Sequence, residues 1–457
     1  ERDAVVPGSH FHGVHGLAFD ADDRLFVGDV LGQAIYEVRL DTRAVEPFVA
    51  SPLGEADDLE FGPDGTLAWT AFFAGEVRAR RPNGEIVTLA SGHPGFNSLA
   101  FAPDGRLYAT TVFLGDELYE IDLAGEKPAR LVAKGFGGLN GFDFGSDGHL
   151  YGPLFTKGKV ARVNIETGEV SVIAEGFGVP AAVNLNSKDE IFVVDTARGE
   201  VVRVDAATGG KTVLSRGAAM IDNLAFDSAD RLFISNASDN AVIEIDASTG
   251  EQTVYVSGLL SVPGDLAFDP ARNQLLVPDV FTFRAVALPD YGISEIARAF
   301  ARELHLPYFV AAGVSGYAVS GIPIGDLSPG SVQIFDAKTG EDTVLDGFKT
   351  PHGLLFEDPN HLLVAEFDAG TVVRVDVGNP SAREIVARKL GGPVGLARGA
   401  DGALYVSEYR AGVLSRLELA TGAREVVAEG LAGPEGIDVF PDGRIVVAEV
   451  GARRIVA

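Results

Sequence analysis

Ten similar short segments recur in this sequence, and most of them open on a residue whose side chain is suited to chemistry. The ten opening residues are His15, Asp57, Asn97, Asn140, Ala181, Asp222, Gly264, His352, Val394 and Glu435. Seven of them carry a carboxylate, a carboxamide or an imidazole. Hard cations such as calcium prefer carboxylate and carboxamide oxygens, and an imidazole titrates near neutral pH. The opening residues therefore predict a polar ring that binds a divalent cation or moves protons.

Two sets of residues follow from this ring. The predicted metal ligands are Asp57, Asn97, Asn140, Asp222 and the adjacent Asn223. So many acidic and polar groups at one level would repel one another without a bound cation. The predicted acid–base residues are His15, His352 and Glu435. Each residue also has an ordinary structural interpretation, because Asn and Asp form turns before Gly or Ser and a channel histidine is often only hydrogen-bonded.

The spacing of the segments indicates how the chain positions these residues. The segments are variations on His15-Gly-Leu-Ala-Phe and recur about every 41 residues. A fixed period of about 40 to 45 residues made of short strands is typical of β-propeller blades. In the third copy we expect strands at 99–101, 106–111, 117–122 and 129–133, with a Pro-Asp-Gly turn after the first. The sequence therefore predicts an all-β propeller of about ten four-stranded blades.

The two ends of the chain suggest how the ring closes. The tenth copy has three expected strands, at 436–439, 444–448 and 453–456, and then the sequence stops. The segment at 3–7 can supply the missing fourth strand. We therefore expect one closed ring over residues 1–457, with two tandem propellers as the alternative.

One interval in the repeat is too long. The seventh and eighth opening residues are 88 positions apart, an excess of about 47. We assign the extra residues, 281–330, to an insertion between the second and third strands of the seventh blade. Residues 294–304 have the apolar spacing of an amphipathic helix, and an apolar, Gly-rich stretch follows. We predict a lid or channel plug, with a surface elaboration or a dimer contact as the alternative.

Aromatic residues recur in the loop after the second strand, on the side of the channel mouth. The predicted substrate-binding residues are Phe72, Phe113, Phe155, Phe281, Phe367 and Tyr409. They favour an apolar or aromatic small-molecule substrate, with packing between blades as the alternative. Acids that end the second strands recur in nearly every blade and therefore indicate scaffolding: Asp29, Asp195, Asp279, Glu366, Glu408 and Glu449.

Composition excludes several classes of partner. The formal net charge of −28 repels phosphate backbones and anionic lipids, so we expect no nucleic-acid partner. The chain has no Cys, and it therefore has no thiol nucleophile and no disulfide. No run of 18 apolar residues predicts a membrane span. The sequence begins at Glu1 and not at Met, which fits a processed secretory protein or a trimmed chain, and we expect a periplasmic or secreted bacterial protein.

The repeat pattern, with its Asp-Gly turns and second strands such as LYVSE and LFISN, resembles NHL-repeat and gluconolactonase/regucalcin-like calcium propellers. The resemblance covers the chain outside about 281–330. Two stretches, GEADDLEFGPDGTLAW at 54–69 and IDNLAFDSADRLFIS at 221–235, resemble paraoxonase-type lactonases. This resemblance implies that a catalytic calcium is bound by Asp57, Asn97, Asn140, Asp222 and Asn223. The family acid in the first stretch is generally Glu, and those relatives have six blades.

Together these features predict a hydrolase of lactones or esters that depends on calcium or another divalent cation. The cation would polarise the carbonyl while His15 or His352 activates water. Two other classes stay open. One is a lyase or condensing enzyme, in the style of streptogramin lyase or strictosidine synthase, in which His352 and Glu435 transfer protons. The other is a non-catalytic propeller of the NHL type. The oligomeric state is open, with a dimer through the insertion as one candidate.

Overall fold

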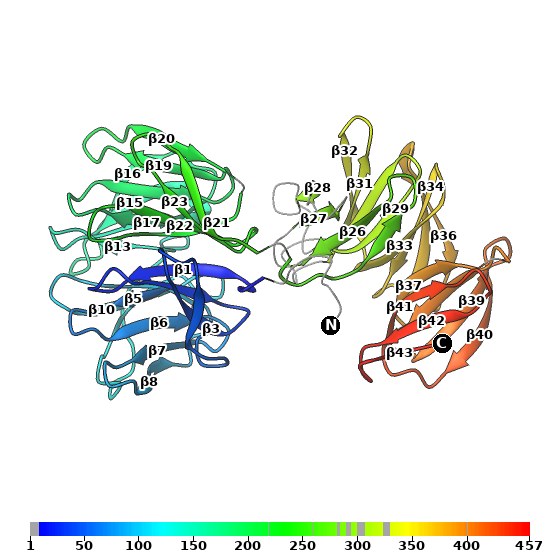
Figure 1. Ribbon diagram of the computed structural model, residues 1–457, viewed down its shortest axis with the longest axis horizontal. Helices are drawn as coiled ribbons and strands as arrows, with labels where there is room; N and C mark the ends of the chain where they lie inside the picture. Colours follow the sequence, from blue (N-terminus) through cyan, green and yellow to red (C-terminus); the bar gives the residue numbers. More distant parts are fainter. Residues whose placement is uncertain are drawn as a thin grey trace. The chain divides into compact units, whose positions relative to one another are not determined.

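The computed structural model describes residues 9–217, 219–258, 260–280, 284–288, 307–322, 330–399 and 401–457, and the backbone alone of residues 294–298. These residues form antiparallel sheets in which the strands follow chain order (Figure 1). In the described part of the chain, ten sheets have four strands and one has three. The all-β prediction and the four-stranded blades are confirmed. The chain divides into two compact units, residues 7–261 (the first unit) and a unit that contains residues 262–457 (the second unit).

The first unit contains six sheets. Its first three sheets comprise β1 (Val14–Phe19), β2 (Leu25–Asp29), β3 (Ala34–Val38) and β4 (Val45–Val49); β5 (Leu59–Phe61), β6 (Leu67–Ala71), β7 (Glu76–Arg80) and β8 (Ile86–Ser91); and β9 (Phe96–Phe101), β10 (Leu107–Thr111), β11 (Glu117–Ile121) and β12 (Arg130–Lys134). Its last three comprise β13 (Asp143–Phe144), β14 (Leu150–Leu154), β15 (Lys159–Val163) and β16 (Val170–Glu175); β17 (Pro180–Leu185), β18 (Ile191–Asp195), β19 (Glu200–Val204) and β20 (Lys211–Arg216); and β21 (Ile221–Phe226), β22 (Leu232–Asn236), β23 (Ala241–Ile245) and β24 (Gln252–Val256). The short 3-10 helix η1 (Phe155–Lys157) connects β14 to β15.

The first unit closes on itself, because β21 of its sixth sheet packs against β1 of its first. The rings of Phe19 and Phe233 have centroids 5.1 Å apart at this junction, inside a buried cluster drawn from both sheets. The hydroxyl of Ser228 donates to Asp23 Oδ2 across the same junction, at 2.6 Å. A single ring of about ten blades was therefore the wrong prediction, since the sixth sheet already finds its apolar partner in the first.

The second unit contains the remaining five sheets, whose inner strands β25, β29, β33, β37 and β41 pack in chain order. Its strands are β25 (Ala267–Asp269), β26 (Gln274–Asp279), β27 (Arg284–Leu288) and β28 (Ser294–Arg298); β29 (Pro307–Ala312), β30 (Gly316–Gly321), β31 (Gly330–Asp336) and β32 (Asp342–Phe348); β33 (Pro351–Asp358), β34 (His361–Glu366), β35 (Thr371–Asp376) and β36 (Asn379–Ala387); β37 (Pro393–Arg398), β38 (Leu404–Glu408), β39 (Val413–Glu418) and β40 (Ala423–Glu429); and β41 (Pro434–Val439), β42 (Ile445–Glu449) and β43 (Arg454–Val456). The last sheet has the three strands expected of it, and the segment at 3–7 that was expected to complete it lies outside the described residues.

Residues 281–330 are not a lid inserted into one blade. They include β27 and β28, which complete the seventh sheet, and β29 and β30, which begin an eighth. The helix predicted at 294–304 is also wrong, because residues 294–298 form β28, and residues 299–304 lie outside the described part. Without an insertion, the reason for expecting a dimer through it disappears.

The acids that end the second strands hold the loop before each inner strand, as predicted. Asp29 is buried and accepts hydrogen bonds from the backbone amides of His12 and Gly32 at 3.0–3.1 Å. Five other blades repeat this bond, with Asp195 accepting from Gly178, Asp279 from Val262, Glu366 from Lys349, Glu408 from Gly391 and Glu449 from Ala432. These carboxylates are scaffolding that sets the path of the chain into each opening residue.

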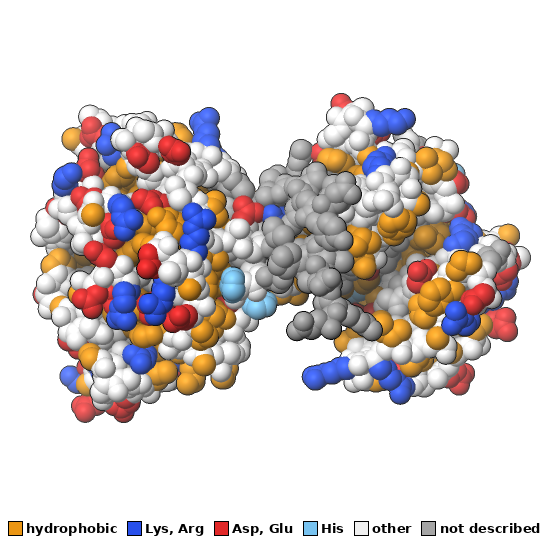
Figure 2. Space-filling model, viewed as in Figure 1, with side chains coloured by type: hydrophobic (Ala, Val, Ile, Leu, Met, Phe, Trp, Pro, Cys, Tyr) orange, Lys and Arg blue, Asp and Glu red, His pale blue; other side chains and the backbone are white. Residues whose placement is uncertain are grey.

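The charges of the first unit are mixed on the face shown in Figure 2, where Lys and Arg side chains lie among Asp and Glu. The first unit also contains surface ion pairs such as Arg106 with Glu166, at 3.1 Å. The net charge of −28 is thus not gathered into one acidic patch on that face. Among the described residues, no helix has the length and apolar character needed to cross a membrane.

Candidate functional site

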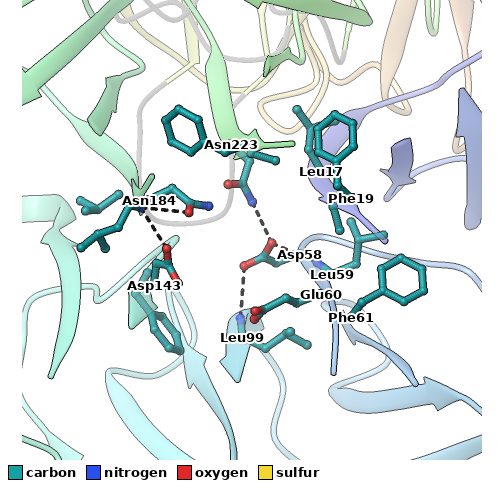
Figure 3. A pocket seen from close by; sticks show the side chains of 16 residues that line it. Leu17, Phe19, Asp58, Leu59, Glu60, Phe61, Leu99, Asp143, Asn184 and Asn223 are labelled. Atoms are coloured by element: carbon teal, nitrogen blue, oxygen red, sulfur yellow. Dashed lines mark hydrogen bonds between the residues drawn. The ribbon is translucent and has the colours of Figure 1, made fainter. Parts of the chain in front are cut away.

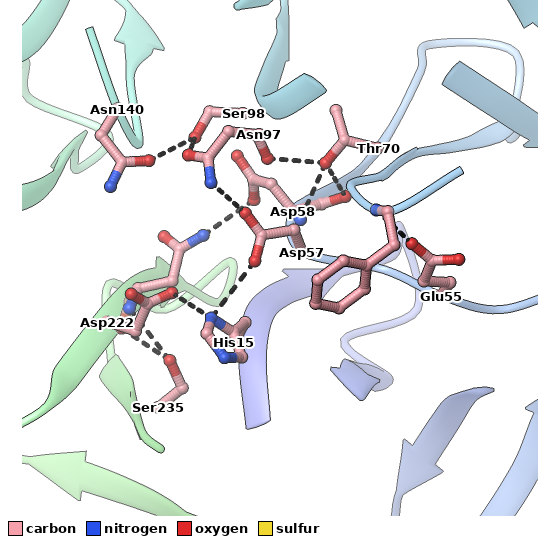
Figure 4. A network of polar contacts seen from close by, with 12 residues as sticks. His15, Glu55, Asp57, Asp58, Thr70, Asn97, Ser98, Asn140, Asp222 and Ser235 are labelled. Carbon is pink, nitrogen blue, oxygen red and sulfur yellow. Dashed lines mark hydrogen bonds and ion pairs between the residues drawn. The ribbon is translucent and has the colours of Figure 1, made fainter. Parts of the chain in front are cut away.

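Four of the five predicted metal ligands belong to one polar network with His15, which itself contacts Asp57 and Asp222, where the inner strands of the first unit begin (Figure 4). His15 lies in β1, Asn97 in β9 and Asp222 in β21, while Asp57 stands two residues before β5 and Asn140 three residues before β13. The six sheets bring these residues together because each stands at the same place in its own blade. We call this group the polar mouth.

His15 is held between two carboxylates. Its Nδ1 lies 3.1 Å from Asp222 Oδ2 and 3.3 Å from Asp57 Oδ1. Burial lowers the pKa of His15, but Asp222 and then Asp57 raise it more, to about 9. The imidazole is therefore protonated at neutral pH, and its Nδ1–H donates toward both acids. Among the described residues none hydrogen-bonds to Nε2, so this atom is the one that can exchange a proton with a ligand.

The network continues round the mouth through amide side chains. Asn97 Nδ2 donates to Asp57 Oδ2, the carboxylate oxygen that faces away from His15. Ser98 Oγ lies 3.2 Å from Asn97 Oδ1 and 3.1 Å from Asn140 Oδ1. Burial raises the pKa of Asp57 to about 7, although His15 opposes this shift. The polar mouth thus combines two carboxylates, two carboxamides and one imidazolium.

A second polar level lies next to the mouth and includes Asp58, the neighbour of Asp57 in the sequence. Asn223 Nδ2 donates to Asp58 Oδ1 at 2.8 Å, and the backbone amide of Leu99 donates to Asp58 Oδ2 at 3.2 Å. Burial raises the pKa of Asp58 to about 8. Asn223 Oδ1 accepts from the amide of Leu224, so the structure directs Asn223 to Asp58 and not to His15.

A cavity of about 220 Å³ begins at Asp58 and Asn223 (Figure 3). Apolar side chains such as Phe19 and Phe61 line part of it, and Glu60 and Asp143 also face it. Burial raises the pKa of Glu60 well above its usual range, and the charge of Asp143 adds to that shift. Glu60 and Asp143, which belong to β5 and β13, were not among the site residues predicted from the sequence. The alternation of residues along one strand does not show that acids from different blades face the same cavity.

The raised pKa of Asp143 can be tested through the pH dependence of the free energy of unfolding. Burial raises its pKa from 3.8 to about 6, although the amides of Leu185 and Phe144 donate to it. The stability that its proton contributes is fully present below about pH 4 and is lost as pH rises through about 6. Asp143→Asn stays neutral. We therefore expect its free energy of unfolding, relative to the parent, to rise by roughly 1–3 kcal/mol between pH 4 and pH 8.

Urea unfolding at the two pH values measures this difference. Asn can accept one backbone hydrogen bond fewer than Asp, which would lower the stability of the variant equally at both pH values. The prediction therefore concerns only the difference in free energy of unfolding between the two pH values. The control is Asp104→Asn, since Asp104 is exposed and its pKa is lowered by hydrogen bonds from Arg106. An Asp143→Asn variant with the same offset from the parent at both pH values would show that the site is well hydrated.

Three of the predicted substrate-binding residues form a row beside the polar mouth. The ring centroids of Phe72 and Phe113 are 6.3 Å apart, and those of Phe113 and Phe155 are 5.4 Å apart. Phe73, which the sequence-based set omitted, packs on Phe72 at 5.3 Å and is 63% exposed. Phe72 and Phe73 follow strand β6, in which Thr70 Oγ1 donates to the backbone carbonyl of Asn97 at 2.6 Å. This hydrogen bond connects the strand that carries the two rings to the polar mouth. We call the four phenylalanines the aromatic rim.

The remaining predicted site residues do not join this group. His352, Glu435, Phe367 and Tyr409 belong to the second unit, and Phe281 lies outside the described residues. The single ring expected to place His15, His352 and Glu435 at one level is not found, because the first six sheets close on themselves.

The polar mouth has the oxygen donors that a hard cation requires, namely the carboxylates of Asp57 and Asp222 and the carboxamides of Asn97 and Asn140. The Nδ1 of His15 lies between the carboxylates of Asp57 and Asp222. In the part of the chain that the structure describes, no three His, Cys, Asp or Glu side chains are grouped as a metal-binding set. Any cation here would therefore rely on the carboxamides as well as the two acids.

No family model and no curated protein matches the sequence. Among solved structures, the chain is similar to tricorn protease (13% identity, TM-score 0.45, 95% of this chain and 46% of that one). It is also similar to the extracellular domain of a hybrid two-component system from B. thetaiotaomicron (11%, TM-score 0.40, 100% and 73%). A gluconolactonase from Xanthomonas campestris is similar over half the chain (17%, TM-score 0.43, 51% and 86%). The chain spans less than half of the tricorn protease. These likenesses assign no activity, and the sheets themselves identify a protein of the β-propeller type.

Proposed function

We propose that the first unit is a hydrolase of lactones or esters, with His15 as its acid–base residue at a divalent-cation site. The observation that carries this proposal is the position of His15, whose Nδ1 faces Asp57 and Asp222 while no described residue hydrogen-bonds to Nε2. Carboxylates that hold one ring nitrogen orient the imidazole and stabilise its charged form, and the other nitrogen is then available to the reacting groups.

Each group has a role in the proposed reaction. Calcium bound by Asp57, Asp222, Asn97 and Asn140 would supply electrophilic polarisation of the substrate carbonyl. His15 accepts a proton at Nε2 from the water that attacks this carbonyl carbon. When the carbon–oxygen bond of the ester breaks, His15 returns that proton to the leaving alkoxide. The neutral imidazole that begins this sequence is favoured when positive charge is bound beside Asp57 and Asp222.

The aromatic rim suits the apolar part of such a substrate. Phe73 and Phe113 are 63% and 62% exposed, and exposed aromatic side chains beside a polar site are a common way to bind an apolar group. The rim and the polar mouth belong to the same unit and are joined through Thr70 and Asn97. We therefore propose a substrate with a carbonyl at the polar mouth and an apolar or aromatic body on the rim.

Elemental analysis combined with hydrolysis assays tests the proposal. After exhaustive dialysis against metal-free buffer, we expect about one calcium per parent chain and none in an Asp57→Ala/Asp222→Ala variant. We also expect the parent to hydrolyse members of a lactone and ester panel, to lose this activity with a chelator and to regain it with calcium. Asp104→Ala, an exposed acid in a turn, is the control that should keep both metal and activity. Activity of the double variant equal to the parent would overturn the proposal.

A further inference from the structure

The opening residues of the second unit differ in chemistry from the polar mouth. By their place at the start of the inner strands they are Gly264 with the adjacent Asp265, Tyr308, His352, Val394 and Glu435. The polar mouth holds its carboxylates against an imidazolium. The second unit instead gathers aromatic rings and two carboxylates, a set that deserves its own explanation and is independent of the function proposed for the first unit.

Five rings form a continuous row. The ring of His352 stacks on Phe367, with centroids 4.7 Å apart and planes 22° apart. It also lies 5.2 Å from Phe309 and 6.2 Å from Tyr308, and Phe367 lies 6.2 Å from Tyr409. Tyr308 and His352 are partly exposed and Tyr409 is 36% exposed. The described residues therefore leave part of this row open to a ligand.

His352 adds a hydrogen-bond acceptor to the row. Its Nδ1 lies 3.1 Å from the carbonyl oxygen of Thr350, and a carbonyl only accepts, so Nδ1 carries the proton. Burial lowers the pKa of His352, which keeps the ring neutral near pH 7. Nε2 is then a lone-pair acceptor, and within the described ranges no hydrogen bond to it is formed.

Asp265 and Glu435 add negative charge. Burial raises the pKa of both carboxyl groups, and the charge of Asp265 raises that of Glu435 further. Both acids also raise the pKa of Tyr308, after burial. Asp265 follows Gly264, which packs directly against the backbone of Tyr308. Asp265 Oδ2 accepts from the amide of Val310 at 3.2 Å. No Lys, Arg or His in the described residues pairs with either acid.

The row already accepts one cation, on the ring of Phe367. The guanidinium of Arg410 lies 4.2 Å from the centroid of Phe367. Its charge is neutralised by Asp368, at 2.6 Å. Asp265 and Glu435 have no such partner among the residues that the structure describes, and both raise the pKa of Tyr308, a member of the same row.

We propose that this end of the second unit binds a small organic cation, an ammonium group carried on an aromatic or apolar body. The row offers ring faces, the acceptor Nε2 of His352 and the hydroxyls of Tyr308 and Tyr409, together with the carboxylates of Asp265 and Glu435, while the charge of Arg410 is paired with Asp368. Ring faces attract cations, and a carboxylate binds an ammonium ion more strongly than a neutral donor. A cation also relieves the repulsion between Asp265 and Glu435, whereas an anion would add to it.

Calorimetric titration of the full chain tests the proposal with three probes that share one body: 2-phenylethylammonium, neutral 2-phenylethanol and anionic 3-phenylpropionate. We expect the cation to bind roughly tenfold or more tightly than the alcohol, and the anion not to bind. Glu435→Gln and Asp265→Asn should each weaken the ammonium probe by roughly tenfold or more. Tyr409→Ala removes a partly exposed ring, so it should fold normally and also weaken binding.

The control is an Asp57→Asn/Asp222→Asn variant, because those acids of the first unit are the other place where a cation could bind. It should bind the ammonium probe as the parent does, whatever its hydrolytic activity. Equal binding of the alcohol and the ammonium ion would overturn the proposal. So would unchanged binding by a folded Glu435→Gln variant, or loss of binding in the first-unit control. Circular dichroism and a thermal melt identify any variant that has not folded.

Discussion

His15→Gln should lower kcat for lactone or ester hydrolysis about 10²–10⁴-fold while KM changes little. Gln is close in size and can hydrogen-bond to Asp57 or Asp222 through its amide, so the polar mouth should keep its shape. An amide cannot accept and return a proton, and the variant therefore lacks the step assigned to Nε2. Steady-state kinetics at saturating calcium, on a substrate that the parent hydrolyses, measure the loss.

The matched control for this variant is His12→Gln. His12 stands three residues earlier, its side chain is 48% exposed and its backbone amide makes the bond to Asp29. The same chemical change there should leave kcat and KM near the parent values. A His15→Gln enzyme with parental kcat would place the proton transfer elsewhere, and a change confined to KM would reduce His15 to a substrate contact.

The residues of the polar mouth could be predicted from the sequence because they occupy equivalent positions in the repeat. His15, Asp57, Asn97, Asn140 and Asp222 each open an inner strand, and residues at the same place in successive blades of one ring must lie at the same level. The direction of the side chains next to them in the sequence could not be predicted in this way. Asn223 follows Asp222 directly, yet its amide is directed to Asp58, because a strand turns successive side chains to different sides.

The number of rings was not accessible from the repeat. A period of about 41 residues is the same for six blades and for ten, and closure depends on which distant sheets pack together. Here that packing joins Phe19 to Phe233, more than two hundred positions apart. The repeat therefore predicts the structure of a single blade but not the number of blades in a ring.

The eighth sheet, by contrast, left a signal that could have been found. The interval of 88 residues is two blade lengths of 44, from Gly264 to Tyr308 and from Tyr308 to His352. Pro307-Tyr308 matches Pro351-His352 and Pro434-Glu435, where a proline also precedes the opening residue. The copy was hidden because its inner strand, PYFVAA, has lost the polar start and the Asp-Gly turn of the other copies.

Phe233→Ala should be the most destabilising of the substitutions considered for the first unit. Phe233 is fully buried and packs on Phe19 at 5.1 Å and on Tyr255 at 5.7 Å, in the cluster that joins the first and sixth sheets. Removing a buried phenyl ring of this kind costs about 3–5 kcal/mol. For a unit of this length, the unfolding midpoint should fall by on the order of 10 °C.

Scanning calorimetry of the full chain turns this prediction into a test of the two units. If they unfold separately, Phe233→Ala lowers the midpoint of one transition and leaves the other in place, because the core clusters of the second unit contain no residue of this junction. Phe268→Ala is the control, since Phe268 is 56% exposed in the second unit and its loss should move neither transition. One transition that shifts as a whole would instead mean that the eleven sheets fold as a single cooperative body, and the closure of the first six would then not define an independent unit.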